Sequence, residues 1–138
     1  MKIINGDNCI AGRIASHAAK AALLGNEVVV VNCDKIVITG DKRTTIEKFL
    51  DVSHRRGKPV KGPFYHRRPD MFMRRMIRRM LPKNARGIIA FKRTMCYVGV
   101  PPAFTAPLET IQDASVEKII VSKYITIAKL CQELGGRW

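Results

Sequence analysis

Four consecutive valines at positions 28–31 constrain the fold more than any other feature of the sequence. The run is β-branched and does not alternate with polar residues, so it predicts a strand buried on both faces, as in the middle of a parallel sheet. Residues 2–4 predict a first strand, and the alanine-rich segment 10–24 between them predicts a helix. Strand, helix and strand at this spacing form a βαβ unit, whose crossover is almost always right-handed.

Capping signals set the limits of these elements. Asp7 or Asn8 is placed to cap the first helix, and Gly25 is placed to end it. Residues 36–38 predict a further short extended piece. A second helix is expected from about residues 39–41, with an apolar stripe formed by Ile46, Phe49 and Leu50.

The middle of the chain breaks this pattern. Residues 53–69 contain three prolines and two glycines, which predict a long basic loop of a kind that is uncommon in a compact domain unless it binds something. A third helix is expected from Pro69 or Asp70 to Leu81, because Pro and Asp are both favourable at a helix start. Its two sides differ: one carries Met73, Met76, Ile77 and Met80, and the other carries Arg74, Arg75, Arg78 and Arg79.

Residues after this helix predict shorter elements. Segment 86–93 is consistent with a further helical turn, and residues 95–100 predict another strand. Thr126 is placed to cap a last helix that runs through about Leu134 and ends at Gly135. The whole chain, residues 1–138, is expected to be one α/β domain with a basic insert at about 54–93.

The charge is concentrated in that insert. Fourteen of the 25 basic residues and one of the 11 acidic residues lie in 54–93, so the segment carries +13 and the other 98 residues carry +1. Ten of the fourteen are arginine, whose planar fork suits bidentate contact with phosphate. An unbound insert would repel itself, so this concentration indicates a binding face for a polyanion rather than a solvated surface.

Other classes of protein find less support. No apolar run is long enough to span a bilayer, and polar residues interrupt the first residues too early for a signal peptide, so a cytoplasmic protein without a membrane partner is expected. The four cysteines form no C-x-x-C pair, and no histidine lies at zinc-ligand spacing, which favours buried thiols over a metal site assembled in space.

A nucleotide-binding enzyme is the main alternative. Gly6 and Gly12 in the first turn do not complete a dinucleotide or P-loop motif. Asp34 follows the second strand, where a Rossmann enzyme would hold a ribose, but a loop or capping role is favoured for it. No nucleophile–base pair stands out, so we expect no catalytic residue, no cofactor and no small-molecule substrate. A nucleic-acid-modifying enzyme on a Rossmann-like sheet remains the second hypothesis.

Three segments carry a resemblance to a known family. Residues 11–16 (AGRIAS) resemble an L-G-R-L-A-S helix opening, residues 28–40 resemble a V-V-V-V-N-A-E-K-A-V-I-T-G strand and turn, and residues 78–83 resemble a signature around R-G-M-L-P. Together they resemble large-subunit ribosomal protein thirteen in its archaeal and eukaryotic form. Ala11 stands where Leu is usual, and Arg79 stands where Gly is commonest, which adds a charge at that point.

The resemblance implies a three-layer α/β/α fold with a mainly parallel four-stranded sheet. It also implies a structural, non-enzymatic role in the large ribosomal subunit, with large-subunit rRNA and neighbouring ribosomal proteins as partners and a part in early subunit assembly. Phe64, Tyr65 and His66 could stack on unpaired bases, and packing of the loop is an equally good role for them. The candidate RNA-binding residues are Arg13, Lys42, Arg43, Arg55, Arg56, Lys58, Lys61, Tyr65, His66, Arg67, Arg68, Arg74, Arg75, Arg78, Arg79, Lys83, Arg86, Lys92 and Arg93.

Overall fold

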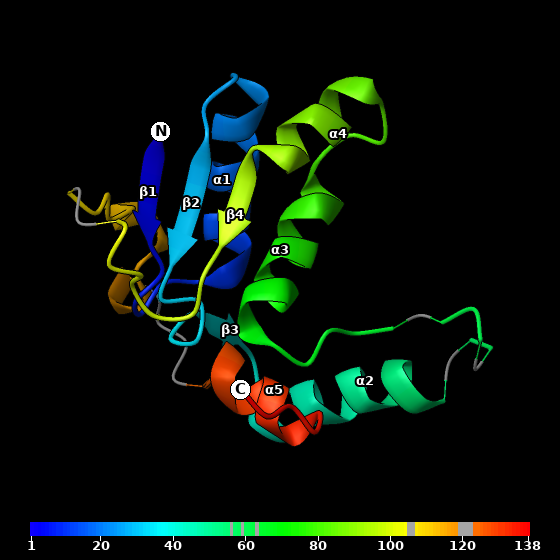
Figure 1. The fold of residues 1–138 in the computed structure, drawn as a ribbon. Helices are drawn as coiled ribbons and strands as arrows, with labels where there is room; N and C mark the ends of the chain where they lie inside the picture. Colours follow the sequence, from blue (N-terminus) through cyan, green and yellow to red (C-terminus); the bar gives the residue numbers. More distant parts are fainter. Residues whose placement is uncertain (56, 59, 63, 105–106, 119–122) are drawn as a thin grey trace.

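The computed structural model describes residues 1–55, 57–58, 60–62, 64–104, 107–118 and 123–138. Three strands form a parallel sheet in the order β1-β2-β4. They are β1 (Lys2–Asn5), β2 (Val28–Val31) and β4 (Thr94–Cys96). Residue Ile3 of β1 lies opposite Val29, and Val30 lies opposite Cys96. The central position predicted for the four valines is therefore confirmed (Figure 1).

The two faces of the sheet are covered differently. Helix α1 (Ala11–Leu23) packs on the face formed by Ile4, Val28 and Val30, where its alanines allow close approach. The opposite face, which includes Val29 and Val31, is covered by Tyr97 and Phe104 from the segment that follows β4. All four valines are 5% exposed or less. Burial on both faces explains why the run does not alternate.

A second, two-stranded sheet lies beside the first. Strand β3 (Val37–Thr39) pairs in antiparallel register with β5 (Tyr124–Thr126), and α5 (Ile127–Glu133) follows directly. The mainly parallel α/β class is confirmed. In the described part of the chain, however, the parallel sheet has three strands, and the extended piece expected near residues 36–38 belongs to this separate pair. Two short 3-10 turns, η1 (Gln112–Ala114) and η2 (Val116–Lys118), precede β5.

The start of α1 corrects one prediction. Neither Asp7 nor Asn8 caps this helix; the N-cap residue is Ile10, whose side chain makes no capping hydrogen bond. The backbone N–H of Ile10 donates to the Ala114 carbonyl at 2.8 Å. Tertiary pairing therefore satisfies the N–H of the N-cap residue, one of the N–H groups that have no partner within the helix. Gly25 ends the helix in the left-handed region, at φ 96°, as expected.

The remaining helices agree closely with the sequence-based limits. Helix α2 (Lys42–His54) is capped by Asp41, whose carboxylate accepts from the Thr44 N–H. Helix α3 spans Pro69–Met80 and α4 spans Ala85–Lys92. Thr126 caps α5, accepting from the Lys129 N–H. Strand β4 is shorter than the predicted 95–100, because only Thr94–Cys96 pairs as a strand with β2.

The arrangement of α2 and α3 gives the molecule an angular shape. Figure 1 shows α2 and the loop after it extending away from the sheet, while α3 rises at an angle to them and leads into α4. None of the side chains of α2 is fully buried, but Ile46, Phe49 and Leu50, the predicted apolar stripe, are half-buried and pack against the core. Among the described residues, no helix combines the length and the apolar character that a bilayer-spanning segment needs.

A candidate nucleic-acid interface on α3 and α4

Helix α3 presents two chemically different faces. Phe72, Met73 and Ile77 are buried against the core, whereas Arg78 and Arg79 are exposed. Arg74 and Arg75 are half-buried. The apolar stripe predicted from the sequence is thus confirmed at its centre but not at its end. Met80 is 42% exposed, and Phe72, which the sequence analysis left out, belongs to the stripe.

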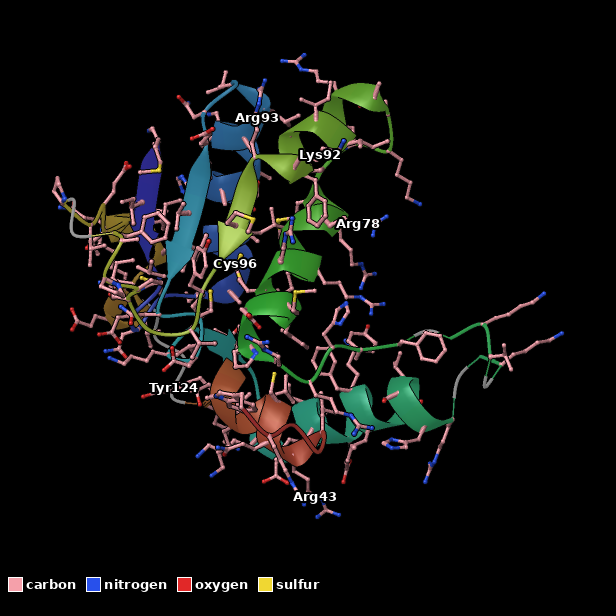
Figure 2. All side chains as sticks on the ribbon, in the orientation of Figure 1. Arg43, Arg78, Lys92, Arg93, Cys96 and Tyr124 are labelled. Atoms are coloured by element: carbon pink, nitrogen blue, oxygen red, sulfur yellow. The ribbon has the colours of Figure 1, made fainter. Side chains whose placement is uncertain are left out.

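Local signals fix both ends of α3. Pro69 occupies the first turn, and the Asp70 carboxylate lies 2.9 Å from the Arg68 guanidinium. At the other end Pro82 follows the C-cap residue Leu81, whose extended backbone stops the helix. These limits hold the arginines on the side of α3 that faces away from the sheet, where Figure 2 shows Arg78.

Aromatic rings support three of the four arginines. The Arg74 guanidinium carbon lies 4.6 Å from the centre of the Phe91 ring, and that of Arg78 lies 5.6 Å from the same ring. The Arg75 guanidinium lies 4.3 Å above the Tyr65 ring, and it also donates a hydrogen bond to the Phe64 carbonyl. Stacking on a ring holds a guanidinium in place without removing its charge.

Among the described residues, no carboxylate neutralises the arginines of α3. Across the described residues, none of the four α3 arginines forms an ion pair, and the insert's only acid, Asp70, pairs with Arg68. The Nε atom of Arg74 is buried and has no hydrogen-bond partner among those residues. Leaving guanidinium donors unpaired in this way is unfavourable in the free protein, and an anion would relieve it.

The arginines surround an open hollow of about 850 Å³. Its lining residues come from the loop before α3, from α3 itself, from the turn after α3 and from the last turn of α4. All nine residues around it belong to the insert: eight are cationic or apolar, and the ninth is the candidate His66. The lining consists of His66, Met71, Arg74, Arg75, Arg78, Arg79, Leu81, Lys83 and Phe91.

A close backbone approach holds α4 against the end of α3. A Cβ atom on Gly87 would lie 1.9 Å from the Pro82 carbonyl oxygen, so only glycine fits there. The Asn84 side chain caps α4, accepting from the Gly87 N–H at 2.9 Å. This tight turn places Phe91 beneath Arg74 and Arg78, a contribution that the sequence analysis missed. Gly87 was the feature of the sequence that could have indicated this close approach.

Several further candidates lie on the same part of the molecule. Arg86, Lys92 and Arg93 belong to the α4 region and are exposed. Arg86 donates to the Leu23 carbonyl at 3.3 Å, which ties α4 to the end of α1. Arg67 is exposed and lies close to Gly135, where a Cβ would be 3.6 Å from its guanidinium. Figure 2 shows Lys92 and Arg93 near one another at the β4 end of α4.

The loop candidates have mixed surroundings. Arg55 lies 3.9 Å from Asp51, one turn back in α2. Lys58 and Lys61 are exposed, and the Lys58 carbonyl closes a turn by accepting from the Gly62 N–H. Arg56 is outside the described residues. Tyr65 packs edge-on to Phe49 at 5.4 Å, so its ring is part of the loop's packing, while Phe64 is 62% exposed.

Three candidates lie away from this surface. Arg13 on α1 donates to the Asp113 carbonyl, and Arg43 on α2 pairs with Glu47 at 2.9 Å. Lys42 is exposed in the first turn of α2. Figure 2 shows Arg43 at the opposite end of the molecule from Lys92. The structure therefore does not bring these three side chains together with the α3 arginines.

Cysteines and acidic residues, which could support catalysis or metal binding, have structural surroundings in the described part of the chain. All four cysteines are buried and free, and burial, with a smaller effect of Asp70, raises the pKa of the Cys131 thiol to about 12. Among the described residues, no group of three or more His, Cys, Asp or Glu side chains is arranged to hold a metal ion. Asp34 accepts from the Gly99 N–H at 3.2 Å, which is the loop role expected for it.

An α/β core whose arginine face has no carboxylate partner among the described residues is the arrangement expected of a polyanion-binding protein. Comparison with known proteins specifies the family. The family model described as ribosomal protein L13 matches residues 1–103. The chain belongs to the ribosomal protein L13 family.

Individual relatives match nearly the whole chain, including the part beyond residue 103. The large ribosomal subunit protein uL13 of Methanopyrus kandleri is 42% identical over 96% of this chain and 86% of its own length. The proteins of the same name from Methanococcus maripaludis and Methanocaldococcus jannaschii are 40% and 39% identical, and each match covers 100% of both chains. The resemblance stated from the three sequence segments, including its archaeal character, is confirmed.

Proposed function

We propose that this protein is a structural constituent of the large ribosomal subunit, where it binds large-subunit rRNA and supports early subunit assembly. The observation that carries the proposal is the set of four α3 arginines around one hollow, without a neutralising carboxylate among the described residues. Arginine pairs phosphate oxygens through two parallel hydrogen bonds, and RNA supplies phosphates at regular spacing. The relatives' printed name supplies the particle.

The RNA-binding surface would include more than α3. Arg67, Lys83, Arg86, Lys92 and Arg93 extend it over the loop and α4, and Lys58 and Lys61 extend it along the part of the loop that follows α2. Phosphate contacts from these side chains would fix the position of the protein on RNA without reading sequence. Arg13, Lys42 and Arg43 would contact RNA only where the rRNA wraps round to the other end of the domain, or neighbouring ribosomal proteins would cover them.

The finer architecture implied by the resemblance, a four-stranded sheet in three layers, is part of this proposal. A one-residue parallel bridge between Ile4 and Glu109 supports a fourth strand at the outer edge of β1. Phe104, shortly before it, packs on the sheet face opposite α1, where the third layer would lie.

A gradient experiment tests the proposed function. Ribosomal particles from the source cells are separated by sedimentation at low and at high salt, and this protein is quantified in each fraction. We expect about one copy per large subunit, retained after a high-salt wash. Recovery at far below one copy per subunit, or release to the top of the gradient at low salt, would contradict a structural role. The nucleic-acid-modifying enzyme would then become the favoured hypothesis.

A further inference from the structure

Phe64, in the loop that leads into α3, is the most exposed aromatic residue in the described part of the chain. It is 62% exposed, against 44% for Trp138 and 43% for Tyr124. Its ring also forms no pair with another aromatic ring among those residues. Single exposed apolar side chains are common on proteins, so the surroundings of this ring decide what it can bind.

The loop holds Phe64 on two sides. The Arg75 guanidinium donates a hydrogen bond to the Phe64 carbonyl while it lies 4.3 Å above the Tyr65 ring. Gly62 lies against one edge of the Phe64 ring, where an added Cβ would be 2.9 Å from Cδ2 and 3.1 Å from Cε2. The Gly62 N–H donates to the Lys58 carbonyl at 2.9 Å and closes the turn before the ring. These contacts position the ring while most of it remains exposed.

Tyr65, the next residue, has a different role. Exposure alternates along this segment: Phe64 and His66 are exposed, and Tyr65 between them is half-buried. The Tyr65 ring packs edge-on to Phe49 at 5.4 Å, and the Arg75 guanidinium lies over one of its faces. A base could stack on Tyr65 only by displacing these contacts, whereas the Phe64 ring is available without any rearrangement.

Cations flank the Phe64 ring along the chain. Lys58 and Lys61 precede it and Arg67 follows it, and all three are exposed. The insert's only acid is paired with another arginine. The loop therefore combines an aromatic ring with positive charge that attracts a polyanion.

The ring also lies beside the hollow lined by the α3 arginines. Arg75, which donates to the Phe64 carbonyl, lines this hollow, and so does His66, two positions along the chain. An RNA strand with phosphates in the hollow and along the loop would bring a base beside Phe64. Proteins bind single-stranded nucleic acids with this combination, in which cations follow the backbone and aromatic rings stack on bases. An apolar protein segment would make no use of the cations.

We propose that Phe64 is a stacking platform for one unpaired base of the rRNA strand whose phosphates occupy the arginine hollow. This inference rests on the proposed function and adds a contact to a base on a surface that otherwise contacts phosphates. Every base has a π-face, so the platform selects an unpaired base over a paired one without selecting its identity.

Affinity measurements with the full-length protein test the platform. Phe64→Leu keeps an apolar side chain and removes the aromatic face. At one fixed salt concentration, it should bind an oligouridine of about ten nucleotides about fivefold or more weakly than wild type. A strand of the same length without bases, and an RNA duplex, should bind both proteins equally. The matched control is Val60→Ala, which changes an 89% exposed apolar residue of the same loop and should leave all three affinities unchanged.

Fluorescence detects the stacking itself. Trp138 is the only tryptophan, so Phe64→Trp combined with Trp138→Phe leaves a single indole at position 64. Oligouridine and large-subunit rRNA should quench its fluorescence through contact with a base, and the strand without bases should not. In the matched control, Val60→Trp with Trp138→Phe, the same RNAs should cause much less quenching.

The outcomes separate this inference from the proposed function. Equal oligouridine binding by wild type and Phe64→Leu, or no quenching at position 64 by bound rRNA, would overturn the platform and leave phosphate-mediated rRNA binding intact. Unchanged RNA binding with reduced incorporation of Phe64→Leu into large subunits would also overturn it, because the ring would then contact a neighbouring protein. Wild-type protein that fails to bind large-subunit rRNA would instead contradict the proposed function.

Discussion

Outside the basic insert, several cations have carboxylate partners: Lys2 pairs with Glu109, Lys118 with Asp113, and Lys123 with Asp41. Inside the insert, residues 54–93, Arg68 pairs with Asp70, but three of the α3 arginines lie against aromatic rings instead, as Arg74 does on Phe91. A ring orients a guanidinium and leaves its charge available, whereas a carboxylate neutralises it. The same chain thus contains a core whose charges are balanced and an insert whose charges remain available for an external anion.

The largest expected effect is on stability, and it comes from the turn between α3 and α4 that holds the insert together. Gly87→Ala places a Cβ atom 1.9 Å from the Pro82 carbonyl oxygen and should lower the free energy of unfolding by about 3 kcal/mol or more. The matched control is Gly12→Ala in α1, where no atom lies within 4 Å of the added Cβ. There the change should stabilise the protein by about 0.5–1 kcal/mol. Chemical denaturation measures both.

If Gly87→Ala leaves stability unchanged, the tight turn between α3 and α4 does not hold the insert together. The position of Phe91 under the arginines would then need another explanation.

The next effect concerns affinity alone. Replacing Arg78 and Arg79 together by Gln removes two exposed charges without loss of helix propensity. If each neutralises one phosphate, the slope of log K against log salt should flatten by about 1.4–1.8 units, and binding to large-subunit rRNA should weaken about tenfold or more at 0.1 M salt. The unfolding free energy should move by less than about 0.5 kcal/mol.

Lys2→Gln with Lys118→Gln is the matched control, because it removes the same charge from two residues that already have carboxylate partners. An equal loss of affinity in this control would mean that net charge, rather than the arginine face, determines RNA binding.

Arg74 is expected to contribute both to the stability of the fold and to RNA binding. Its guanidinium stacks on Phe91 and its Nε atom is buried, so Arg74→Gln should lose about 0.5–1 kcal/mol of stability together with one unit or less of salt slope. Arg74→Lys should keep the slope and lose the stacking. A thermal melt and a salt titration distinguish them. If Arg74→Gln changes only the melt, this arginine is a structural residue that does not contact RNA.

The smallest expected effect concerns the loop before α3. Its glycines and prolines predict that the free protein exchanges the amide hydrogens of residues 54–69 rapidly and that RNA binding slows the exchange. Tyr65, which packs on Phe49, should be the most protected position before RNA is added. Hydrogen exchange of the described residues measures this, and equal protection with and without RNA would refute it.

The sequence was sufficient where local chemistry decides the structure. The unalternated valines predicted β2, and the proline at each end of the Met/Arg segment predicted α3 almost to the residue. It was insufficient where distant segments decide. The start of α1 has no polar cap, and the N–H of its N-cap residue Ile10 pairs with the distant Ala114 carbonyl. Phe91, which lies on the next helix, is the surface on which Arg74 stacks.

The candidate site shows the same division. The concentration of charge in residues 54–93 pointed to the arginine face, because basic and acidic residues can be counted along the sequence. Only folding could decide that Tyr65 packs against Phe49 while Phe64 is exposed, and that Arg13 and Arg43 lie apart from α3.

The C-terminal glycines have a consequence for the order in which the molecule is completed. A Cβ on Gly136 would lie 2.2 Å from the Arg67 carbonyl oxygen, so the last residues of the chain pass directly against the loop that leads into α3. Strand β5, which closes the second sheet, is also made late. During synthesis the arginine-rich middle emerges before the segments that secure it. A nascent chain therefore exposes these arginines to any nearby RNA before the segments around β5 and Gly136 have been made.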